Sequence, residues 1–196
     1  EQGASIVNHA QVIGFLRDGN DVCGVEVQDA LSGEVYKVRA RLVVNAAGHW
    51  LDCVRDLLRG GPASTVRRTK GIHLLTPRLT EKALVLFSPS DGRLFFVMPW
   101  LDYTLIGTTD TDYSGDLDAV YADEKDVAYL LEGACQVFPK LRSEDIFYTT
   151  AGLRSLAYSG GEKPSDVTRE HRVLDHKFRD GIEGLVSVLG GKITAY

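Results

Sequence analysis

Three cations, Arg154, Arg169 and Lys192, follow apolar runs or flexible loops from which a side chain can reach into a cleft. Two guanidinium groups and an ammonium group can together hold a dianion such as a phosphate group. The alternative for the two arginines is a set of surface or interdomain salt bridges, since exposed arginines are common. The residue types therefore permit an anion site without requiring one.

His73 is a titratable residue inside the apolar run Lys70–Leu75. A histidine in such a place can take a proton from an alcohol, because its ordinary pKa lies near neutral pH. A core histidine with its hydrogen bonds satisfied is the other interpretation. The histidines show no metal-ligand spacing with cysteines or carboxylates, so the sequence predicts no metal site.

Two small-residue motifs, Asn45–Gly48 and Gly190–Tyr196, each follow an apolar run. Glycine has no Cβ, so a phosphate group or a ring edge can lie directly against the backbone N–H groups there. We therefore expect these motifs to contact a large, flat ligand. The chain contains no GxGxxG, so a dinucleotide-binding enzyme would need that unit before residue 1, and we expect this chain to be a piece of a larger enzyme.

The elements that must position these residues change in character along the chain. Residues 11–44 alternate apolar and polar side chains between Gly-containing turns, which predicts a three-stranded meander followed by a short buried parallel strand. Residues 49–59 can form a helix. Residues 62–147 contain several apolar or alternating runs, which predict an antiparallel sheet, together with a helix over 123–138 that ends at Pro139.

Composition excludes some classes of function. The chain has 196 residues and a net charge of -5, which argues against a nucleic-acid partner. It has no apolar run that could span a bilayer and no signal-peptide pattern. The three cysteines are widely spaced without a CxxC, which argues against zinc and a disulfide framework.

Several segments, in order over nearly the whole chain, resemble the FAD-dependent glycerol-3-phosphate dehydrogenases. The most specific is 98–110, which is similar to the family's "PW…TLIGTTD" run. Histidine and serine stand at positions 49 and 155, where the family usually has proline. The other matching segments are 45–50 (NAAGHW), 69–73 (TKGIH), 152–156 (GLRSL), 168–171 (TREH) and 190–196 (GGKITAY).

The resemblance implies a fold of the D-amino-acid-oxidase type, of mixed α/β and α+β class. A discontinuous, Rossmann-like FAD-binding domain there carries an inserted antiparallel substrate domain. The expected divisions are 1–61 in the FAD-binding domain, 62–147 in the substrate domain, and 148–196 as the return to the FAD-binding domain with substrate-site strands.

The resemblance also implies roles for individual residues. Arg154, Arg169, His73 and Lys192 would bind the substrate, and His73, Arg154 and Lys192 would be catalytic, with His73 a candidate base. The residues expected to contact FAD are Ala47, Gly48, Gly190, Gly191, Lys192 and Thr194.

The implied reaction is oxidation of sn-glycerol 3-phosphate to dihydroxyacetone phosphate by hydride transfer to FAD. The family leads us to expect a quinone as electron acceptor, a cytoplasmic enzyme peripheral on the inner face of the cytoplasmic membrane, and a homodimer as one option. We expect this piece alone to be inactive and to bind FAD weakly or not at all. Two alternatives stay open, namely a related FAD enzyme acting on a 2-hydroxy acid or amine, and a non-catalytic β-rich interaction module.

Overall fold

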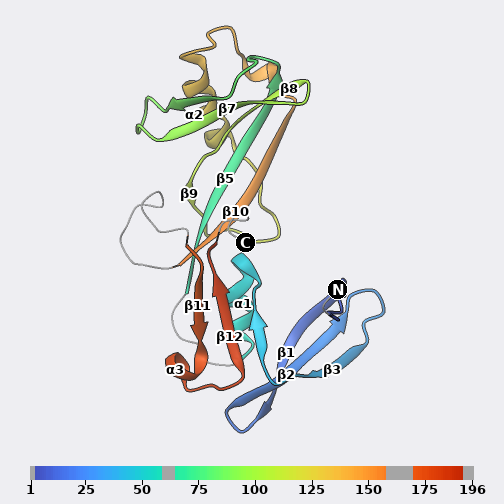
Figure 1. Ribbon diagram of the computed structural model, residues 1–196. Coiled ribbons are helices and arrows are strands. Elements are labelled where there is room, and N and C mark those ends of the chain that lie inside the picture. Colours follow the sequence, from blue (N-terminus) through green and yellow to red (C-terminus); the bar gives the residue numbers. More distant parts are fainter. Residues whose placement is uncertain (1–2, 59–64, 158–169, 192–196) are drawn as a thin grey trace. The chain divides into compact units, whose positions relative to one another are not determined.

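The computed structural model describes residues 3–58, 65–157 and 170–191. Their contacts divide the chain into two compact units. Among the described residues, unit 1 consists of 3–66 and 155–191, and unit 2 of 67–154. The division falls inside two long strands, β5 (Val66–Pro77) and β10 (Tyr148–Ala157), which are neighbours in one sheet (Figure 1). The sequence predicted the domain divisions after residues 61 and 147, and the assignment of these segments to the domains of the whole enzyme stays a prediction.

Unit 1 begins with the predicted meander. Strands β1 (Ala10–Asp18), β2 (Asp21–Asp29) and β3 (Val35–Arg39) pair in antiparallel order. Gly19 and Gly33 occupy the two turns with φ of 60° and 78°, a backbone conformation that favours glycine. The meander is therefore confirmed as a local hairpin structure.

The second sheet of unit 1 joins distant parts of the sequence. Strand β12 (Leu185–Leu189) pairs in parallel with β4 (Val43–Asn45) and in antiparallel with β11 (Arg172–Asp175). The parallel strand is confirmed. Among the described residues Val44 is 54% exposed and Asn45 is 4% exposed, so the predicted burial holds for only part of this strand.

Three short helical segments accompany these strands. A 3-10 turn, η1 (Gly48–Trp50), leads directly into α1 (Leu51–Asp56), and α3 (His176–Asp180) lies between β11 and β12. The predicted helix over 49–59 is thus shorter in the described residues, and α3 was not predicted. Buried apolar residues hold the unit together in two clusters, Leu51–Val66–Ala157–Leu189 and Val22–Leu58–Leu185.

Unit 2 is built on the predicted antiparallel sheet. Its strand order is β10, β5, β8, β7, β6, with β9 also paired to β5. The remaining strands are β6 (Leu84–Phe87), β7 (Leu94–Trp100), β8 (Tyr103–Gly107) and β9 (Thr111–Asp112). The predicted helix is confirmed as α2 (Glu124–Cys135), and a 3-10 turn, η2 (Ser143–Asp145), precedes β10.

Helix α2 packs on one face of this sheet. Its Leu130 and Ala134 are fully buried in one cluster with sheet residues such as Ile72 and Phe95. Gly133 allows the close approach, since a Cβ there would lie 2.7 Å from the Phe95 ring. Side chains alternate along a strand, so the neighbouring positions point to the opposite face of the sheet.

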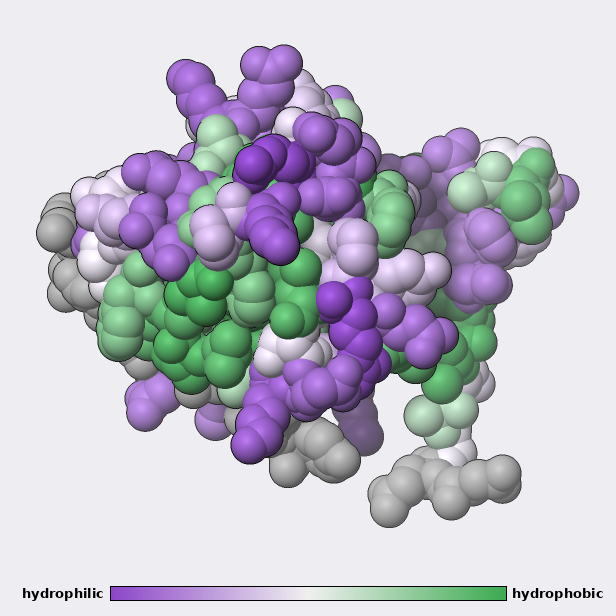
Figure 2. Space-filling model, turned by 90° about the horizontal axis from the view of Figure 1, so that it is seen from above, coloured by the Kyte–Doolittle hydropathy of each residue, from purple (hydrophilic) through white to green (hydrophobic). Residues whose placement is uncertain are grey.

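That opposite face is apolar and open among the described residues. Val85, Phe87, Leu94 and Phe96, all on the neighbouring strands β6 and β7, are between 38% and 67% exposed. Figure 2 shows a broad green, apolar patch on one side of this view, with separate green groups elsewhere. His73 belongs to the same face, because the register aligns it through Gly107 with Phe96.

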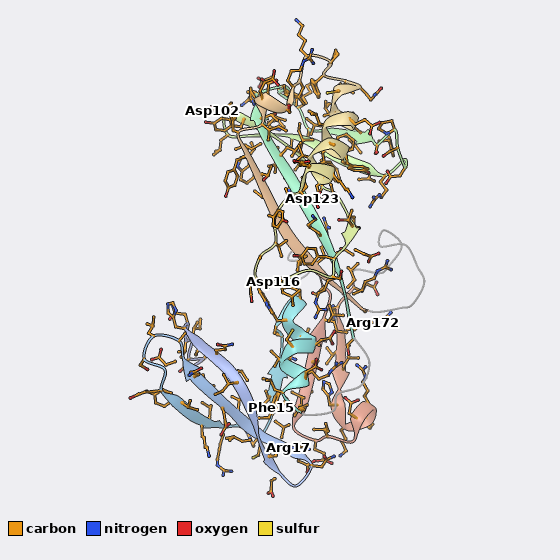
Figure 3. The ribbon with its side chains drawn as sticks, turned by 180° about the vertical axis from the view of Figure 1, so that it is seen from behind. Phe15, Arg17, Asp102, Asp116, Asp123 and Arg172 are labelled. Carbon is orange, nitrogen blue, oxygen red and sulfur yellow. The ribbon has the colours of Figure 1, made fainter. Side chains whose placement is uncertain are left out.

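Lys70 fastens strand β5 to the start of helix α2. Its ammonium group is almost buried and lies 2.8 Å from Asp123 Oδ2 and 2.5 Å from Asp126 Oδ2. Asp123, labelled in Figure 3, also caps the helix, because it accepts hydrogen bonds from the backbone N–H groups of residues 125 and 126. Burial alone would lower the pKa of Lys70, but the two carboxylates raise it, so this amine stays charged.

We expect Lys70→Met to lower the free energy of unfolding by about 3 kcal/mol, because it leaves a buried carboxylate without its counter-charge. Lys125→Met is the matched control, since Lys125 is exposed on the same helix. The control should change stability by less than about 0.5 kcal/mol. Urea denaturation of the whole protein measures both variants. Equal effects would show that the buried ion pairs contribute no stability.

Candidate functional site

The small-residue motifs of unit 1 meet at one edge of a sheet. Strands β4 and β12 run in parallel with Ser187 opposite Asn45, so their carboxyl ends point the same way. Ala47 and Gly48 follow the first strand, and Gly190 and Gly191 follow the second. In open α/β sheets, ligands bind in crevices at this end of the strands.

The glycines at this edge adopt backbone conformations that other residues rarely take. Gly48, Gly190 and Gly191 have φ of 57°, 64° and 87°. A Cβ on Gly190 would also lie 2.6 Å from the carbonyl oxygen of Glu170. Both the backbone conformation and the lack of space thus require glycine at position 190, and a turn without Cβ atoms suits the close approach of a flat ligand with phosphate groups.

Asn45 shapes the first turn, a role that we did not assign to it from the sequence. Its amide group donates to the carbonyl of Leu51 (3.0 Å), and its Oδ1 accepts from the N–H of Ala47 (3.2 Å). Asn45 is 4% exposed. A short polar residue between an apolar run and two alanines was the signal in the sequence, because asparagine bonds readily to the backbone two residues on.

A buried polar network supports the second strand from inside unit 1. His176 Nε2 lies 2.8 Å from Ser187 Oγ, and His176 Nδ1 contacts Asp180. The order Ser–His–Asp resembles a hydrolase triad, but Ser187 is completely buried. No substrate can reach that hydroxyl group here, so the network holds α3 against β12.

Three of the predicted site residues, Arg169, Lys192 and Thr194, lie outside the described residues. Their predicted roles stay predictions. The structure describes the other six, with Ala47, Gly48, Gly190 and Gly191 in unit 1 and His73 and Arg154 in unit 2.

Arg154 occupies a defined place on the sheet of unit 2. Its Nη2 donates to Thr108 Oγ1 (2.9 Å), and its Nη1 donates to the carbonyl oxygen of Thr109 (3.2 Å) and to Asp110 Oδ1 (3.1 Å). The side chain is 25% exposed. The alternative reading of Arg154 as a salt-bridged arginine is therefore partly right, since it pairs with Asp110, yet the guanidinium group still reaches the surface.

His73 lies close to Arg154 on the same sheet. The guanidinium group lies against Gly71, two residues before His73 and on the same face of β5. Thr150 Oγ1 is 3.4 Å from His73 Nδ1. Burial and the positive charge of Arg154 both lower the pKa of His73, so the imidazole is neutral at neutral pH. A neutral imidazole beside a fixed cation can accept a proton from a bound anionic alcohol.

Other kinds of site find no support in the part of the chain that the structure describes. It contains no group of three or more His, Cys, Asp or Glu side chains that could hold a metal ion. Cys23, Cys53 and Cys135 are free thiols. None of the described helices combines the length and apolar character that crossing a bilayer requires.

Comparison with known proteins identifies relatives of the whole chain. It is 37% identical to a glycerol-3-phosphate dehydrogenase of Synechocystis sp., over 99% of this chain and 38% of the relative. It is 36% identical to an aerobic glycerol-3-phosphate dehydrogenase of Staphylococcus haemolyticus, over 100% of this chain and 35% of the relative. The chain therefore spans little more than a third of the length of these relatives.

Solved structures agree with the sequence relatives. A glycerol-3-phosphate dehydrogenase from Bacillus halodurans, complexed with FAD, superimposes with a TM-score of 0.82 at 31% identity, over 97% of this chain and 36% of that one. Glycine oxidase from Geobacillus kaustophilus shares the fold alone, with a TM-score of 0.61 at 20% identity, over 96% of this chain and 44% of that one. The fold expected from the resemblance, of the D-amino-acid-oxidase type, is confirmed.

The family described as "DAO: FAD dependent oxidoreductase" matches residues 1–196, the full length of the sequence. The edge formed by β4 and β12 and the sheet that carries His73 and Arg154 therefore belong to a member of the FAD-dependent oxidoreductase family.

Proposed function

We propose that the whole protein, of which this chain forms a part, oxidises sn-glycerol 3-phosphate to dihydroxyacetone phosphate with FAD as its cofactor. The observation that carries the proposal is that one sheet holds both a neutral imidazole, His73, and a guanidinium group, Arg154, whose orientation is fixed by hydrogen bonds. The names of the relatives support the same reaction.

The residues of unit 1 fit FAD. The turn at Gly190 has no room for a Cβ, and Gly48 and Gly191 also hold positive φ. Such turns expose N–H groups to a phosphate group or a ring edge. We assign Ala47, Gly48, Gly190 and Gly191 to this contact, and Lys192 and Thr194 on the resemblance alone. When bound, FAD accepts the two electrons of the oxidation as a hydride.

The residues of unit 2 suit the substrate. A phosphate monoester is close to a dianion at neutral pH, so it is bound best by a planar guanidinium group that can donate two parallel hydrogen bonds. Arg154 supplies that group, and the resemblance adds Arg169. Holding the phosphate group at one end of a three-carbon substrate fixes where C2 lies, which lowers the entropic part of the barrier.

His73 is the group that we assign to the proton. Oxidation of a secondary alcohol releases a hydride from carbon and a proton from oxygen, and the proton needs an acceptor. Thr150 Oγ1 lies near His73 Nδ1, so we assign the tautomer in which the Nδ1–H group donates to Thr150 and Nε2 takes the proton of the C2 hydroxyl group. The lowered pKa keeps this nitrogen unprotonated before the reaction.

The proposal also covers the electron acceptor, the location of the protein and its oligomeric state. Electrons pass on to a quinone, the protein lies in the cytoplasm at the inner face of the cytoplasmic membrane, and two copies can form a homodimer. The support for these points is the resemblance to the family. Sedimentation with membrane vesicles tests the location, quinone reduction in their presence tests the acceptor, and the mass of the particle in solution tests the homodimer.

For the cofactor, we expect Gly190→Ala to weaken FAD binding by at least about tenfold, which corresponds to about 1.4 kcal/mol. Gly33→Ala is the control, because Gly33 also has positive φ but no atom within 4 Å of its added Cβ. Both variants carry similar backbone strain, so only the first should affect the cofactor. Titration of the FAD-free whole protein measures the affinity. Equal affinity in the two variants would contradict the assignment of this turn.

For the substrate, we expect Arg154→Ala to lower kcat/KM for glycerol 3-phosphate by roughly 10- to 100-fold, since a hydrogen bond to a charged group contributes about 1.5–3 kcal/mol. Arg78→Ala is the control, because Arg78 forms an exposed pair with Glu81. Rapid mixing with substrate, followed by the loss of flavin absorbance, measures the step. Flavin that stays oxidised in the parent protein would exclude this substrate and favour other hydroxy acids or amines.

For the base, we expect kcat/KM to fall as the pH drops through the pKa of His73, because protonated imidazole cannot accept a proton. That pKa is lowered, so the fall should lie below pH 6.5, the ordinary value. Arg154→Ala removes a positive charge and should therefore move the fall to higher pH. His73→Asn should abolish it and slow flavin reduction by about 100-fold or more. A pH profile of His73→Asn that matches the parent profile would exclude His73 as the base.

A further inference from the structure

Arg154 is held by three consecutive residues after strand β8. Its two terminal nitrogens donate to the hydroxyl group of Thr108, the carbonyl oxygen of Thr109 and the carboxylate of Asp110, at 2.9, 3.2 and 3.1 Å. The Asp110 side chain is only 10% exposed. Its backbone is fixed in turn, because Arg93 donates a hydrogen bond to the Asp110 carbonyl oxygen. The guanidinium group is thus bound along one edge by a segment that is itself anchored.

Gly71 supplies the surface on which the guanidinium group lies. A Cβ at Gly71 would overlap the end of the Arg154 side chain, with its Cζ at 2.6 Å. Gly71 is not among the residues with positive φ, so its backbone suits any residue. Glycine is needed here for the space that the guanidinium group takes, and not for the chain conformation.

Asp110 is an unexpected neighbour for a phosphate-binding arginine. A carboxylate lowers the local positive charge and repels a phosphate dianion. Such a group weakens anion binding unless it contributes in another way. Fixing the plane and direction of the guanidinium group is such a contribution, because a long arginine side chain otherwise loses considerable rotamer entropy when it binds.

We propose that Gly71, Thr108 and Asp110 are positioning residues that orient the Arg154 guanidinium group and thereby give the site its preference for a phosphorylated substrate over the neutral polyol. This inference rests on the proposed function. The residues act through Arg154 and do not themselves bind the substrate. The competing possibility is an ion pair that only stabilises unit 2.

Gly71→Ala separates these possibilities. The added methyl group displaces the flexible end of one side chain, so the fold should survive while Arg154 moves. We expect KM for glycerol 3-phosphate to rise by roughly tenfold, as for the loss of about one charged hydrogen bond. The kcat/KM for glycerol, which lacks the phosphate group, should stay at the parent value. Gly14→Ala is the control, because its added Cβ would also meet the end of one flexible side chain, Glu26 Oε2 at 3.2 Å, in unit 1.

Asp110→Asn tests the carboxylate in the same assay of the whole protein. We expect a similar rise in KM for glycerol 3-phosphate, with glycerol again unaffected, and Asp110→Glu should restore part of the loss. Asp116→Asn, in an exposed turn, is the control. A purely structural role would reduce activity toward both substrates in proportion, and that result would overturn the proposal.

Double variants test whether the residues act through Arg154. With Arg154→Ala present, neither Gly71→Ala nor Asp110→Asn should raise KM further, because the group that they position is gone. Additive effects would overturn the inference. If Arg154→Ala alone leaves KM unchanged, the proposed phosphate contact fails instead. If Arg154→Ala raises KM while Gly71→Ala and Asp110→Asn do not, the proposed function stands and only the positioning role is lost.

Discussion

The parallel pairing of β4 with β12 is the contact on which the arrangement of unit 1 depends. It joins residues 43–45 to residues 185–187, about 140 positions apart, through backbone hydrogen bonds in one fixed register. Parallel neighbours cannot be joined by a tight turn, so a long connection must lie between them, and here unit 2 is part of that connection. Because both strands end at the same edge, two glycine-containing turns that are far apart in the sequence come together. Burial of Leu51 and Leu189 in one cluster holds that edge in place.

In unit 2, side chains alternate between the two faces of the sheet, so one face carries the buried core and the other carries the proposed site. Ile72 and Leu74 point into the core under helix α2, while Gly71 and His73 point to the other face. One strand therefore contributes both to the buried core and to the proposed site. This arrangement places a half-buried imidazole on the same sheet as Arg154, and burial and the charge of Arg154 both lower its pKa.

The charges of unit 2 have different roles according to their burial. Lys70 is nearly buried and paired with two carboxylates, which suits a structural tie between β5 and α2. Arg154 is paired with the carboxylate of Asp110 and stays partly exposed, which suits a group that meets a ligand. Lys70 and Gly71 are neighbours on β5, and the Arg154 side chain of β10 lies against Gly71. The two charges therefore lie on opposite faces of the sheet, with Lys70 on the face that α2 covers.

The amino-acid sequence by itself determined the elements that depend on local patterns. The meander, the helix after Asp123 and the antiparallel runs follow from periodicity, turn residues and caps, which act over a few positions. The resemblance of short motifs identified the family, and His73 and Arg154 as candidates. Only the tertiary structure decided that Arg154 lies on Gly71 and pairs with Asp110, that β4 pairs with β12, and where the units divide. These features depend on contacts between segments tens of residues apart, so no local pattern encodes them.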